Sequence, residues 1–348
     1  MISPQSILII KLSAIGDVVH TLPLLEVLRN NLTNARIDWV VEEDSSQIID
    51  GHSAIDHVII SKRKSWQKRF LKAGETIKVV REVAHFLGEL RSEEYDVVID
   101  LQGLFKSGML TGLSRAKRKI GFTGGREGSV LFLTERPFLV DYNEHAIDRY
   151  LKTVGYLNLR KTPWSGEIPI TEEAKRSVDE FLHDLGLQEK RLVAINPIAK
   201  WETKLWEPEK FSVLADRLAG ELSFSIVFTG SGADRRHIIG IIDHMKSPAI
   251  NLAGRTGLKE LAYLYSKCRL TVSTDTGPMH IAAAMGTPVV AIFGPTAPWR
   301  TGPYGKKHRV IRAGVECSPC FNKKCDTMTC MKDITVQKVF DSAKTFLI

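Results

Sequence analysis

The sequence of 348 residues contains no uninterrupted apolar run of the roughly 18 residues that a transmembrane helix needs. Its N-terminus lacks the basic, then apolar, then small-residue pattern of a secretory signal peptide. Short-period repeats and low-complexity tracts are also absent. Hydrophobic residues at 43% and charged residues at 25% are typical of a globular protein and exclude a disordered chain. We therefore expect a globular protein that stays in the cytoplasm.

Two ligand-binding motifs are missing as well. The chain has no Asp-x-Asp motif, so the sequence does not indicate a required metal, and any magnesium dependence would be an auxiliary effect. The three spaced glycines and the downstream acid of the dinucleotide fingerprint are absent. Their absence argues against a nicotinamide-dependent oxidoreductase, which is one alternative for a chain of this type.

Positive charge is in excess, with a net charge of +8, and basic proteins associate with phosphates, nucleic acids or anionic membranes. Cations gather over residues 62–72, where Trp66 and Phe70 lie among them without an acidic residue, and again over 115–119. An aromatic pair in a basic run favours an anionic, partly apolar surface, although a solvated helix face is the plainer interpretation of either run. A nucleic-acid-binding protein would need one continuous basic face, and these separate runs do not indicate one.

Short β-branched apolar runs alternate with helical patterns, which is typical of βαβ units in an α/β fold. Because the chain exceeds what one hydrophobic core usually serves, we expect two doubly wound domains, 1–165 and 166–334. The segment 335–348 should form an amphipathic helix, begun by Thr335, that packs back across the domain junction. The predicted strands are 7–12, 37–41, 57–60, 97–101, 118–121, 192–196, 225–229, 249–252, 270–273 and 289–293.

A lone carboxylate, Asp17, follows the first predicted strand where the chain turns through Gly16 into a helix. Active sites of open α/β sheets lie at such strand ends. Free amides and the dipole of a helix N-terminus favour an ionised carboxylate, which leaves Asp17 able to accept a proton from a substrate. An N-capping aspartate with no further role is the alternative interpretation.

The second half carries a sharper pattern. The strand at 270–273 runs into Thr274-Asp275-Thr276-Gly277-Pro278, which should open a short helix that ends before Gly286. Amides at such an N-terminus bind phosphate, and Asp275 and Thr276 can address hydroxyls of the group that the phosphate carries. The turn at 293–296 ends the next strand on the same edge of the sheet. Together the two loops predict a nucleotide-diphosphate site.

Two further loops are expected to complete that site. Lys200 and Lys204 follow the strand at 192–196, and a lysine at a strand's carboxyl end is a natural partner for a pyrophosphate. Asp234 follows the strand at 225–229 in a glycine-containing turn. Exposed loop residues without a ligand are the alternative interpretation of each of them.

Five segments spread over both halves match one known family: KLSAIGDVVH at 11–20, DWVVEE at 38–43, DLQGL with Lys106-Ser107 at 100–107, His145-Ala146 with Asp148-Arg149, and STDTG at 273–277. The chain resembles glycosyltransferase family 9 and is most similar to the lipopolysaccharide heptosyltransferases of type I. The resemblance implies a GT-B fold, in which two Rossmann-like domains face a cleft. It also implies inverting transfer of L-glycero-D-manno-heptose from ADP-heptose to the Kdo (3-deoxy-octulosonic acid) residue of Kdo-lipid A, in lipopolysaccharide inner-core synthesis.

The resemblance also implies roles for single residues. Asp17 would be the base that deprotonates the acceptor hydroxyl, and Lys204 with the amides of Thr276 and Gly277 would stabilise the leaving diphosphate. The donor site implied by family and charge comprises Lys200, Lys204, Asp234, Asp275, Thr276, Gly277 and His280. The acceptor site comprises Lys62, Arg63, Gln102, Lys106, Arg126 and Arg149. Trp66 and Phe70 would lie against acyl chains at the cytoplasmic face of the inner membrane, where the enzyme would be peripherally associated, and nucleic acid is not an expected partner.

Four of the five cysteines form a C-x2-C-x4-C-x4-C cluster near the C-terminus: Cys317, Cys320, Cys325 and Cys330. This cluster resembles the tail of the type II enzymes, which transfer heptose to heptose, so transfer to heptose, or another family 9 sugar transfer, is the alternative. In a cytoplasmic chain the spacing suggests a structural zinc site before disulfides, whereas the single CxxC pair favours reduced free thiols. Cys268 is expected in the core.

Overall fold

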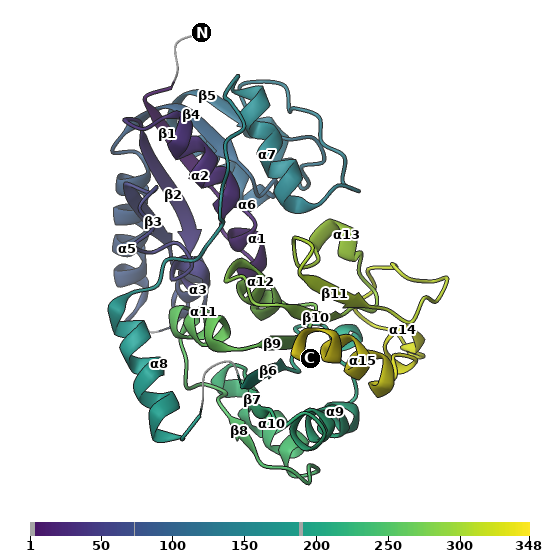
Figure 1. The fold of residues 1–348 in the computed structure, drawn as a ribbon. Coiled ribbons are helices and arrows are strands. Elements are labelled where there is room, and N and C mark those ends of the chain that lie inside the picture. The colour runs from purple at the N-terminus through teal and green to yellow at the C-terminus, as the bar shows by residue number, and fades with distance from the viewer. Residues whose placement is uncertain (1–3, 73, 188–190) are drawn as a thin grey trace. The chain divides into compact units, whose positions relative to one another are not determined.

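The chain folds into two compact units, which divide between Pro169 and Ile170. The computed structural model describes residues 4–72, 74–187 and 191–348, whose elements are labelled in Figure 1. We expected the division after residue 165, in the polar segment just before this point. Among the described residues, no helix has the length and apolar character needed to cross a membrane.

The first unit is built around a five-stranded parallel sheet of order β3-β2-β1-β4-β5. Its strands are β1 (Ser6–Ile10), β2 (Arg36–Glu42), β3 (His57–Ser61), β4 (Glu94–Asp100) and β5 (Arg115–Gly121). Its α-helices are α1 (Ile15–Val19), α2 (Leu22–Asn31), α3 (Glu43–Ser46), α4 (Arg63–Arg69), α5 (Thr76–Leu90), α6 (Phe105–Leu113) and α7 (Ala146–Tyr156). A short 3-10 turn, η1, spans Ser129–Phe132.

The strand order places β1 and β4 side by side at the point where the winding of the sheet changes direction. Ile7–Ile10 of β1 are fully buried, as expected for a strand covered on both faces. The loops after β1 and β4 therefore leave the same edge of the sheet, where α/β proteins place their ligand sites. The loop after β1 leads into α1, which carries Asp17.

The second basic run of the sequence is the edge strand β5. Lys117 pairs with Asp96 at 2.8 Å and Arg115 with Glu94 at 3.8 Å, both partners lying on β4. Lysine and arginine on an edge strand discourage pairing with other chains. The run is thus not the solvated helix face that was its plainer interpretation, because its residues form an edge strand whose cations Arg115 and Lys117 pair within the sheet.

The second unit has a six-stranded parallel sheet of order β11-β10-β9-β6-β7-β8. Its strands are β6 (Leu192–Asn196), β7 (Ser225–Phe228), β8 (Ala249–Asn251), β9 (Leu270–Thr274), β10 (Val289–Ile292) and β11 (His308–Ile311). Its α-helices are α8 (Glu172–Asp184), α9 (Pro208–Gly220), α10 (Arg235–Ile242), α11 (Leu258–Lys267), α12 (Gly277–Ala284), α13 (Pro298–Thr301), α14 (Thr329–Lys332) and α15 (Val336–Leu347). Two 3-10 turns, η2 (Glu202–Lys204) and η3 (Gly232–Asp234), follow β6 and β7.

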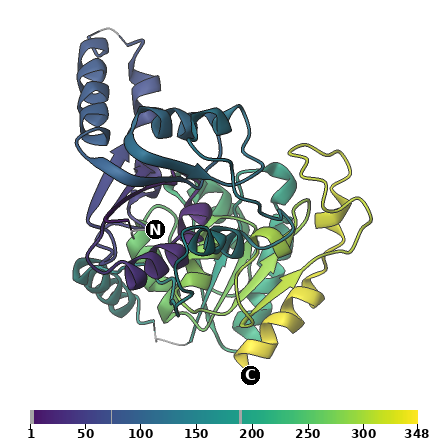
Figure 2. The same ribbon diagram turned by 90° about the horizontal axis from the view of Figure 1, so that it is seen from above.

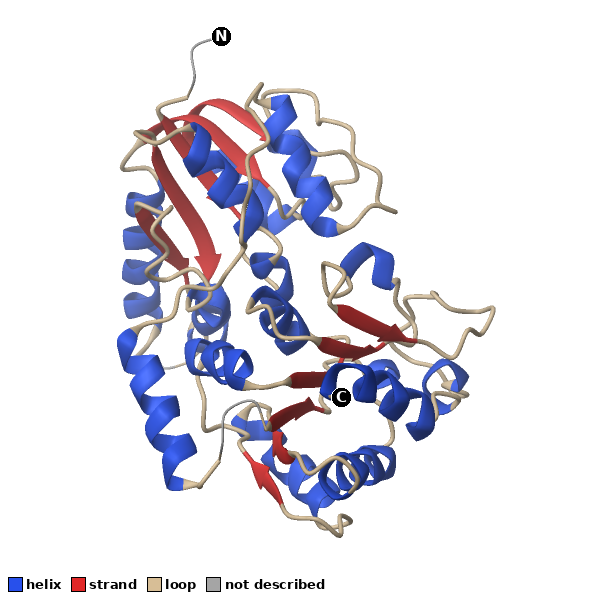
Figure 3. Ribbon diagram, viewed as in Figure 1, coloured by secondary structure: helices blue, strands red, loops and turns tan. Residues whose placement is uncertain are grey.

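Figure 3 shows helices flanking the strands in each unit, so the predicted α/β class with two doubly wound domains is confirmed. The predicted signals for α12 are also confirmed, since Pro278 lies in its first turn and Gly286 follows its end with a φ of +73°. The edge strand β11 was not predicted. It is short and partly exposed, so it lacks the apolar run that marks the other strands.

The last helix, α15, begins as predicted, because the Thr335 side chain accepts a hydrogen bond from the backbone amide of Lys338. Its buried side chains, Val339, Phe340 and Ala343, belong to the hydrophobic core of the second unit. These side chains form the apolar face of α15, which we expected to pack across the domain junction. Their burial is explained by contacts within the second unit.

Candidate active site

Asp17 lies in the first turn of α1, directly after the carboxyl end of β1. One carboxylate oxygen, Oδ2, accepts a hydrogen bond from the Ala14 amide at 3.1 Å. The other, Oδ1, accepts from the Tyr150 hydroxyl at 3.5 Å and lies 3.8 Å from Nζ of Lys11. The side chain keeps 38% of its surface exposed. Asp17 is therefore fixed by three neighbours and still open to a substrate.

Lys11 supports Asp17 from inside the protein. Its ammonium is buried and donates to the Leu101 carbonyl at 2.9 Å and to the Tyr150 hydroxyl at 2.7 Å. Burial works against the charged form, but the nearby Asp17, Tyr150 and Asp100 outweigh it, and the pKa of Lys11 is raised above its usual value. A permanent positive charge thus lies behind the candidate base.

Tyr150 was missed by sequence reasoning. It lies on α7, where an aromatic residue in an amphipathic helix is typical of core packing. Burial raises the pKa of its hydroxyl, so Tyr150 stays protonated and can donate to Asp17. The only sequence signal next to Tyr150 was the family match within His145–Arg149, at the start of the same helix.

Two of the predicted acceptor cations converge on Glu42, at the end of β2. The buried Glu42 carboxylate accepts from Lys106 Nζ and from Arg63 Nη2, each at 2.9 Å. Lys106 also donates to the Ser13 hydroxyl at 2.9 Å, in the loop that leads to Asp17. Burial alone would raise the pKa of Glu42, but the hydrogen bonds from Lys106 and Arg63 dominate and lower it. The sequence match included Glu42 but gave it no role.

The other acceptor candidates have different surroundings. Gln102 accepts from the Leu12 and Ser13 amides, each at 3.2 Å, and so holds the loop before Asp17. Lys62 is exposed, 4.0 Å from Glu43. Gln102 and Lys62 therefore lie outside the set of side chains that hydrogen-bond to Glu42.

Two arginines complete the acceptor set. Arg149 is buried, with its guanidinium over the Tyr142 ring, and it donates to the Tyr142 carbonyl at 3.3 Å. Arg126 is exposed, and its guanidinium has no hydrogen bond or ion pair with any residue in the described part of the chain. Arg126 is thus the acceptor candidate whose charge is available.

Trp66, which we expected against acyl chains, is instead buried. It stacks near Phe86, with 5.4 Å between ring centroids, and its Nε1 donates to Glu82 at 2.9 Å. Phe70 remains exposed. The expectation for Trp66 was wrong because α5 packs against α4 and buries the indole in the core of the first unit.

In the second unit the predicted donor residues Lys204 and Asp275 form an ion pair, with 2.6 Å between Nζ and Oδ2. The same Oδ2 accepts from the Thr296 hydroxyl at 2.6 Å. Lys204 also lies over the Trp201 ring, 4.5 Å from its centroid. The turn at 293–296 was recognised from the sequence, but Thr296 itself was not assigned.

Thr276 and Gly277 follow Asp275 directly, as the N-cap and first residue of α12. This places the start of a helix, with its free amides, beside the Lys204–Asp275 pair, a combination that suits an anionic group. His280 lies one turn further along α12 and is buried.

Lys200 and Asp234 are less closely associated with this cluster. Lys200 is exposed, without an ion pair to any described residue. Asp234 accepts at one oxygen, Oδ2, from the amide and the hydroxyl of Ser231, at 2.7 and 2.6 Å. Its carboxylate therefore shapes its own turn.

The segment at 317–330, which contains the four clustered cysteines and is called here the four-cysteine segment, packs against the loops of the donor cluster. The amides of Cys320 and Phe321 donate to the Pro295 carbonyl at 3.0 and 2.8 Å. The Ser318 hydroxyl donates to the Gly294 carbonyl, and the Thr203 hydroxyl donates to the Asn322 carbonyl at 2.8 Å. The segment thus holds both the loop before Lys204 and the loop before Thr296.

All five thiols are free, and Cys268 is buried, as expected for a core residue. Burial raises the pKa of the Cys330 thiol, and the three other cysteines of the segment raise it further. Among the described residues, no group of three or more His, Cys, Asp or Glu side chains is arranged to hold a metal ion.

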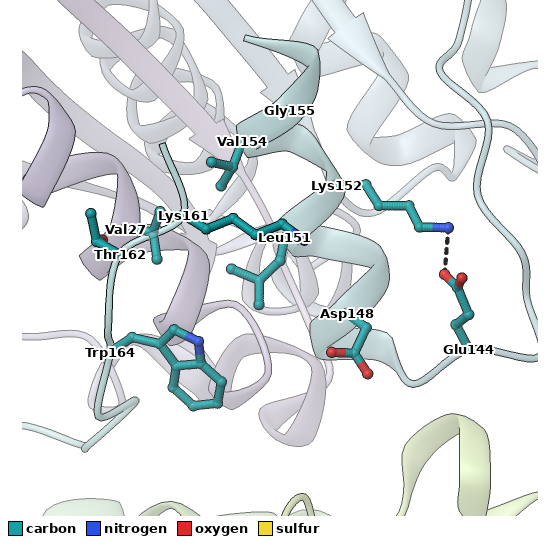
Figure 4. Close-up of a pocket in the computed structure, with 10 residues that line it drawn as sticks. All are labelled: Val27, Glu144, Asp148, Leu151, Lys152, Val154, Gly155, Lys161, Thr162 and Trp164. Carbon is teal, nitrogen blue, oxygen red and sulfur yellow. Dashed lines mark ion pairs between the residues drawn. The ribbon is translucent and has the colours of Figure 1, made fainter. Parts of the chain in front are cut away.

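A pocket of about 480 Å³ lies elsewhere in the first unit, between α2, α7 and the segment at 161–164 (Figure 4). Its apolar lining includes Leu151 and Trp164, and the Lys152–Glu144 ion pair borders it. None of the candidate residues is among the described residues that line it.

A family model for glycosyltransferase family 9 (heptosyltransferase) matches residues 83–331. Among curated proteins, lipopolysaccharide heptosyltransferase 1 of Pseudomonas aeruginosa is 29% identical to this chain, and the match covers 96% of the chain and 90% of that protein. The protein of the same name from Escherichia coli K12 is also 29% identical, with 88% of this chain and 93% of that protein covered.

Solved structures agree with these matches. A glycosyltransferase of family 9 from Veillonella parvula superposes with a TM-score of 0.83 at 26% identity, covering 99% of this chain and 97% of that one. E. coli heptosyltransferase WaaC with ADP gives a TM-score of 0.77 at 26% identity, covering 98% and 99%. The predicted GT-B class is thereby confirmed.

Proposed function

The chain belongs to glycosyltransferase family 9, and we propose that it transfers L-glycero-D-manno-heptose from ADP-heptose to the Kdo residue of Kdo-lipid A, in lipopolysaccharide inner-core synthesis. The similarity to two heptosyltransferases 1 over most of the chain supports this reaction. A structure of WaaC with ADP-2-deoxy-2-fluoro heptose, 25% identical with a TM-score of 0.75, supports the donor. The observation that carries the proposal is an exposed carboxylate, Asp17, held by Lys11 and Tyr150 at the edge of the sheet.

In this reaction Asp17 accepts the proton of the acceptor hydroxyl as that oxygen attacks the anomeric carbon. The bond between the anomeric carbon and ADP breaks on the opposite face, and the sugar inverts its configuration. Tyr150 and the Ala14 amide hold the carboxylate, so that it is oriented before the substrate arrives. The carboxylate keeps enough exposed surface to reach a hydroxyl from solvent.

Negative charge develops on the diphosphate of the departing ADP. Lys204 and the amides at the start of α12 are the groups that stabilise it. Lys204 is held by Asp275 in this structure, so the diphosphate replaces that carboxylate as the partner of the ammonium. Because these groups carry the charge themselves, we propose that no metal is required and that any magnesium effect is auxiliary.

The acceptor carries carboxylate and phosphate groups, and the first unit offers cations for them. Arg126 is free to bind an anion. Lys106 and Arg63 both donate hydrogen bonds to Glu42, and Lys106 also donates to Ser13. Because this acceptor is a lipid, we propose that the enzyme works in the cytoplasm, peripherally bound to the inner membrane.

The experiment that tests the function measures ADP release from ADP-heptose with separate acceptors that end in Kdo or in the first heptose. We expect turnover with the Kdo acceptor, and a loss of about 10²- to 10⁴-fold in Asp17→Ala, the usual contribution of a general base. ADP binding to Asp17→Ala, measured by calorimetry, should stay at the wild-type level. The proposal fails if the wild type releases ADP with neither acceptor.

One alternative has an observation in its favour. The four-cysteine segment resembles the tail of type II enzymes and packs against the donor loops. Turnover confined to the heptose acceptor would move the chain to heptose-to-heptose transfer and leave the role of Asp17 unchanged.

A further inference from the structure

We propose that the turn after α4 and the outer face of α5 form a docking surface for an anionic lipid bilayer. This surface, called here the α4–α5 face, comprises Phe70, Leu71, Lys72, Ile77, Val80 and Arg81. Figure 2 shows the two helices standing clear of the strands of the first unit, at the upper left. The inference rests on the proposed function in one respect, since a lipid-borne acceptor requires the enzyme at a membrane.

Large apolar side chains are exposed together on this face. Leu71 is 90% exposed and Ile77 68%, and Phe70 and Val80 are exposed as well. The Thr76 hydroxyl donates to the Phe70 carbonyl at 2.8 Å, which joins the start of α5 to the end of α4. The apolar residues at the two helix ends therefore form one patch.

The pattern along α5 extends this patch. Ile77, Val80 and the exposed Ala84 are spaced i, i+3 and i+7, so they share one side of the helix. The opposite side carries Val79 and Phe86, which are buried in the core of the first unit. A helix with a second apolar stripe facing solvent has more apolar surface than its own unit uses.

The net charge around the patch is positive. Arg69 donates to Glu75 and to Glu82 at 2.9 Å, and Lys78 donates to Glu75 at 3.2 Å, so two cations offset the two acidic side chains. Lys68, Lys72 and Arg81 make no side-chain ion pair or hydrogen bond within the described part of the chain. The α4–α5 face is thus apolar at its centre and positive around it.

This combination fits a bilayer that carries anionic headgroups. Leucine, isoleucine and phenylalanine enter the boundary between headgroups and acyl chains, while lysine and arginine remain with the phosphates. Each cation adds electrostatic attraction that depends on the fraction of anionic lipid and on salt. Nucleic acid would match the cations but would leave Leu71 and Ile77 without an apolar environment.

Co-sedimentation of the full chain with lipid vesicles tests the proposal, without donor or acceptor present. One set of vesicles contains phosphatidylcholine alone, and the other contains equal parts of phosphatidylcholine and phosphatidylglycerol. We expect binding to the anionic vesicles that weakens as salt is raised, and little binding to the neutral ones. The variant Leu71→Ser/Lys72→Glu should bind anionic vesicles at least about tenfold more weakly.

A matched control comes from the same unit. Arg136→Glu/Leu139→Ser removes an exposed arginine and a leucine that is 84% exposed, close to the exposure of Leu71. This control should bind vesicles as the wild type does. Equal binding by both variants, or no binding by the wild type, would overturn the proposal.

A second copy of the chain is the competing occupant. If the α4–α5 face joined two copies, sedimentation velocity without lipid would show a dimer that Leu71→Ser/Lys72→Glu dissociates, and that result would also overturn the proposal. Because no sugar transfer is measured, failure here leaves the proposed reaction intact, and failure of the reaction leaves vesicle binding to be judged separately.

Discussion

Lys204 and Asp275 form an ion pair with 2.6 Å between Nζ and Oδ2, and they come from loops that follow neighbouring strands, β6 and β9. Thr296, after the next strand β10, donates to the same carboxylate oxygen. The ion pair and Thr296 thus connect the segments that follow three adjacent strands, β6, β9 and β10. They lie at the point where the order of the sheet reverses. The Asp275 carboxylate holds the lysine in place before a diphosphate arrives.

The first prediction concerns this lysine. Lys204→Met should lower the rate of sugar transfer by about 10²- to 10³-fold, because one preorganised charge at the leaving group is lost. Initial rates at saturating acceptor and varied ADP-heptose will measure it. Lys175→Met is the control, since Lys175 pairs with Glu172 at 2.7 Å on the exposed side of α8. Equal effects of the two variants would remove Lys204 from the donor site.

Tyr150 leads to a second prediction, which separates orientation from binding. Tyr150→Phe removes one hydrogen bond to Asp17 and one acceptor of Lys11, so kcat should fall roughly tenfold while both KM values hold. Tyr156→Phe is the matched control, because the Tyr156 hydroxyl on the same helix donates to Glu135 at 2.7 Å. An unchanged kcat in Tyr150→Phe would mean that Lys11 and the Ala14 amide suffice to orient the base.

The fold was largely predictable because its signals are local. Buried parallel strands appear as apolar runs such as Ile7–Ile10, and the signals that begin or end a helix, at Thr335 and Gly286, act on residues close by. The edge strand β11 escaped because it is partly exposed. A strand that buries little carries little apolar pattern.

The site was predictable only in part, for a different reason. Asp17, Lys204 and Asp275 each lie in the first segment after a strand, in α1, in η2 and just before α12, and such positions are visible in the sequence. Their partners are set by packing between distant segments: Tyr150 is 139 residues from Lys11, and Glu42 is 64 from Lys106. Trp66 shows the reverse error, because its burial depends on where α5 packs.

The third prediction concerns pH and Glu42. The pKa of Glu42 is lowered from 4.5 in the folded chain, so its contribution to stability is present above the unfolded pKa and is lost as pH falls through the folded one. At neutral pH, Glu42→Gln should lower the free energy of unfolding by about 1–3 kcal/mol, since Lys106 and Arg63 lose a charged partner. Below the folded pKa, wild type and variant should be equally stable.

Urea denaturation at neutral and at acidic pH measures both values for Glu42→Gln. Glu221→Gln serves as the control, because Glu221 pairs with Arg217 at 2.7 Å but is half exposed. An exposed pair of this kind is screened by solvent, so the control should change stability little at either pH. A destabilisation of Glu42→Gln that persists in acid would show a packing effect instead of a charge effect.

The last prediction assigns the four-cysteine segment a positioning role for the donor loops. Thr203→Val removes the hydrogen bond from the buried Thr203 hydroxyl to the Asn322 carbonyl and keeps the size of the side chain. Because this bond ties the segment to the turn that carries Lys204, the KM for ADP-heptose should rise several-fold while kcat stays close to that of the wild type.

Thr345→Val is the matched control for Thr203→Val, since the Thr345 hydroxyl also donates to a carbonyl, that of Ser342, at 2.8 Å. It lies on α15, whose buried side chains serve the core of the second unit. A KM raised in Thr203→Val alone assigns the effect to the donor loops. Equal KM values in the two variants would show that the segment packs against these loops without positioning Lys204.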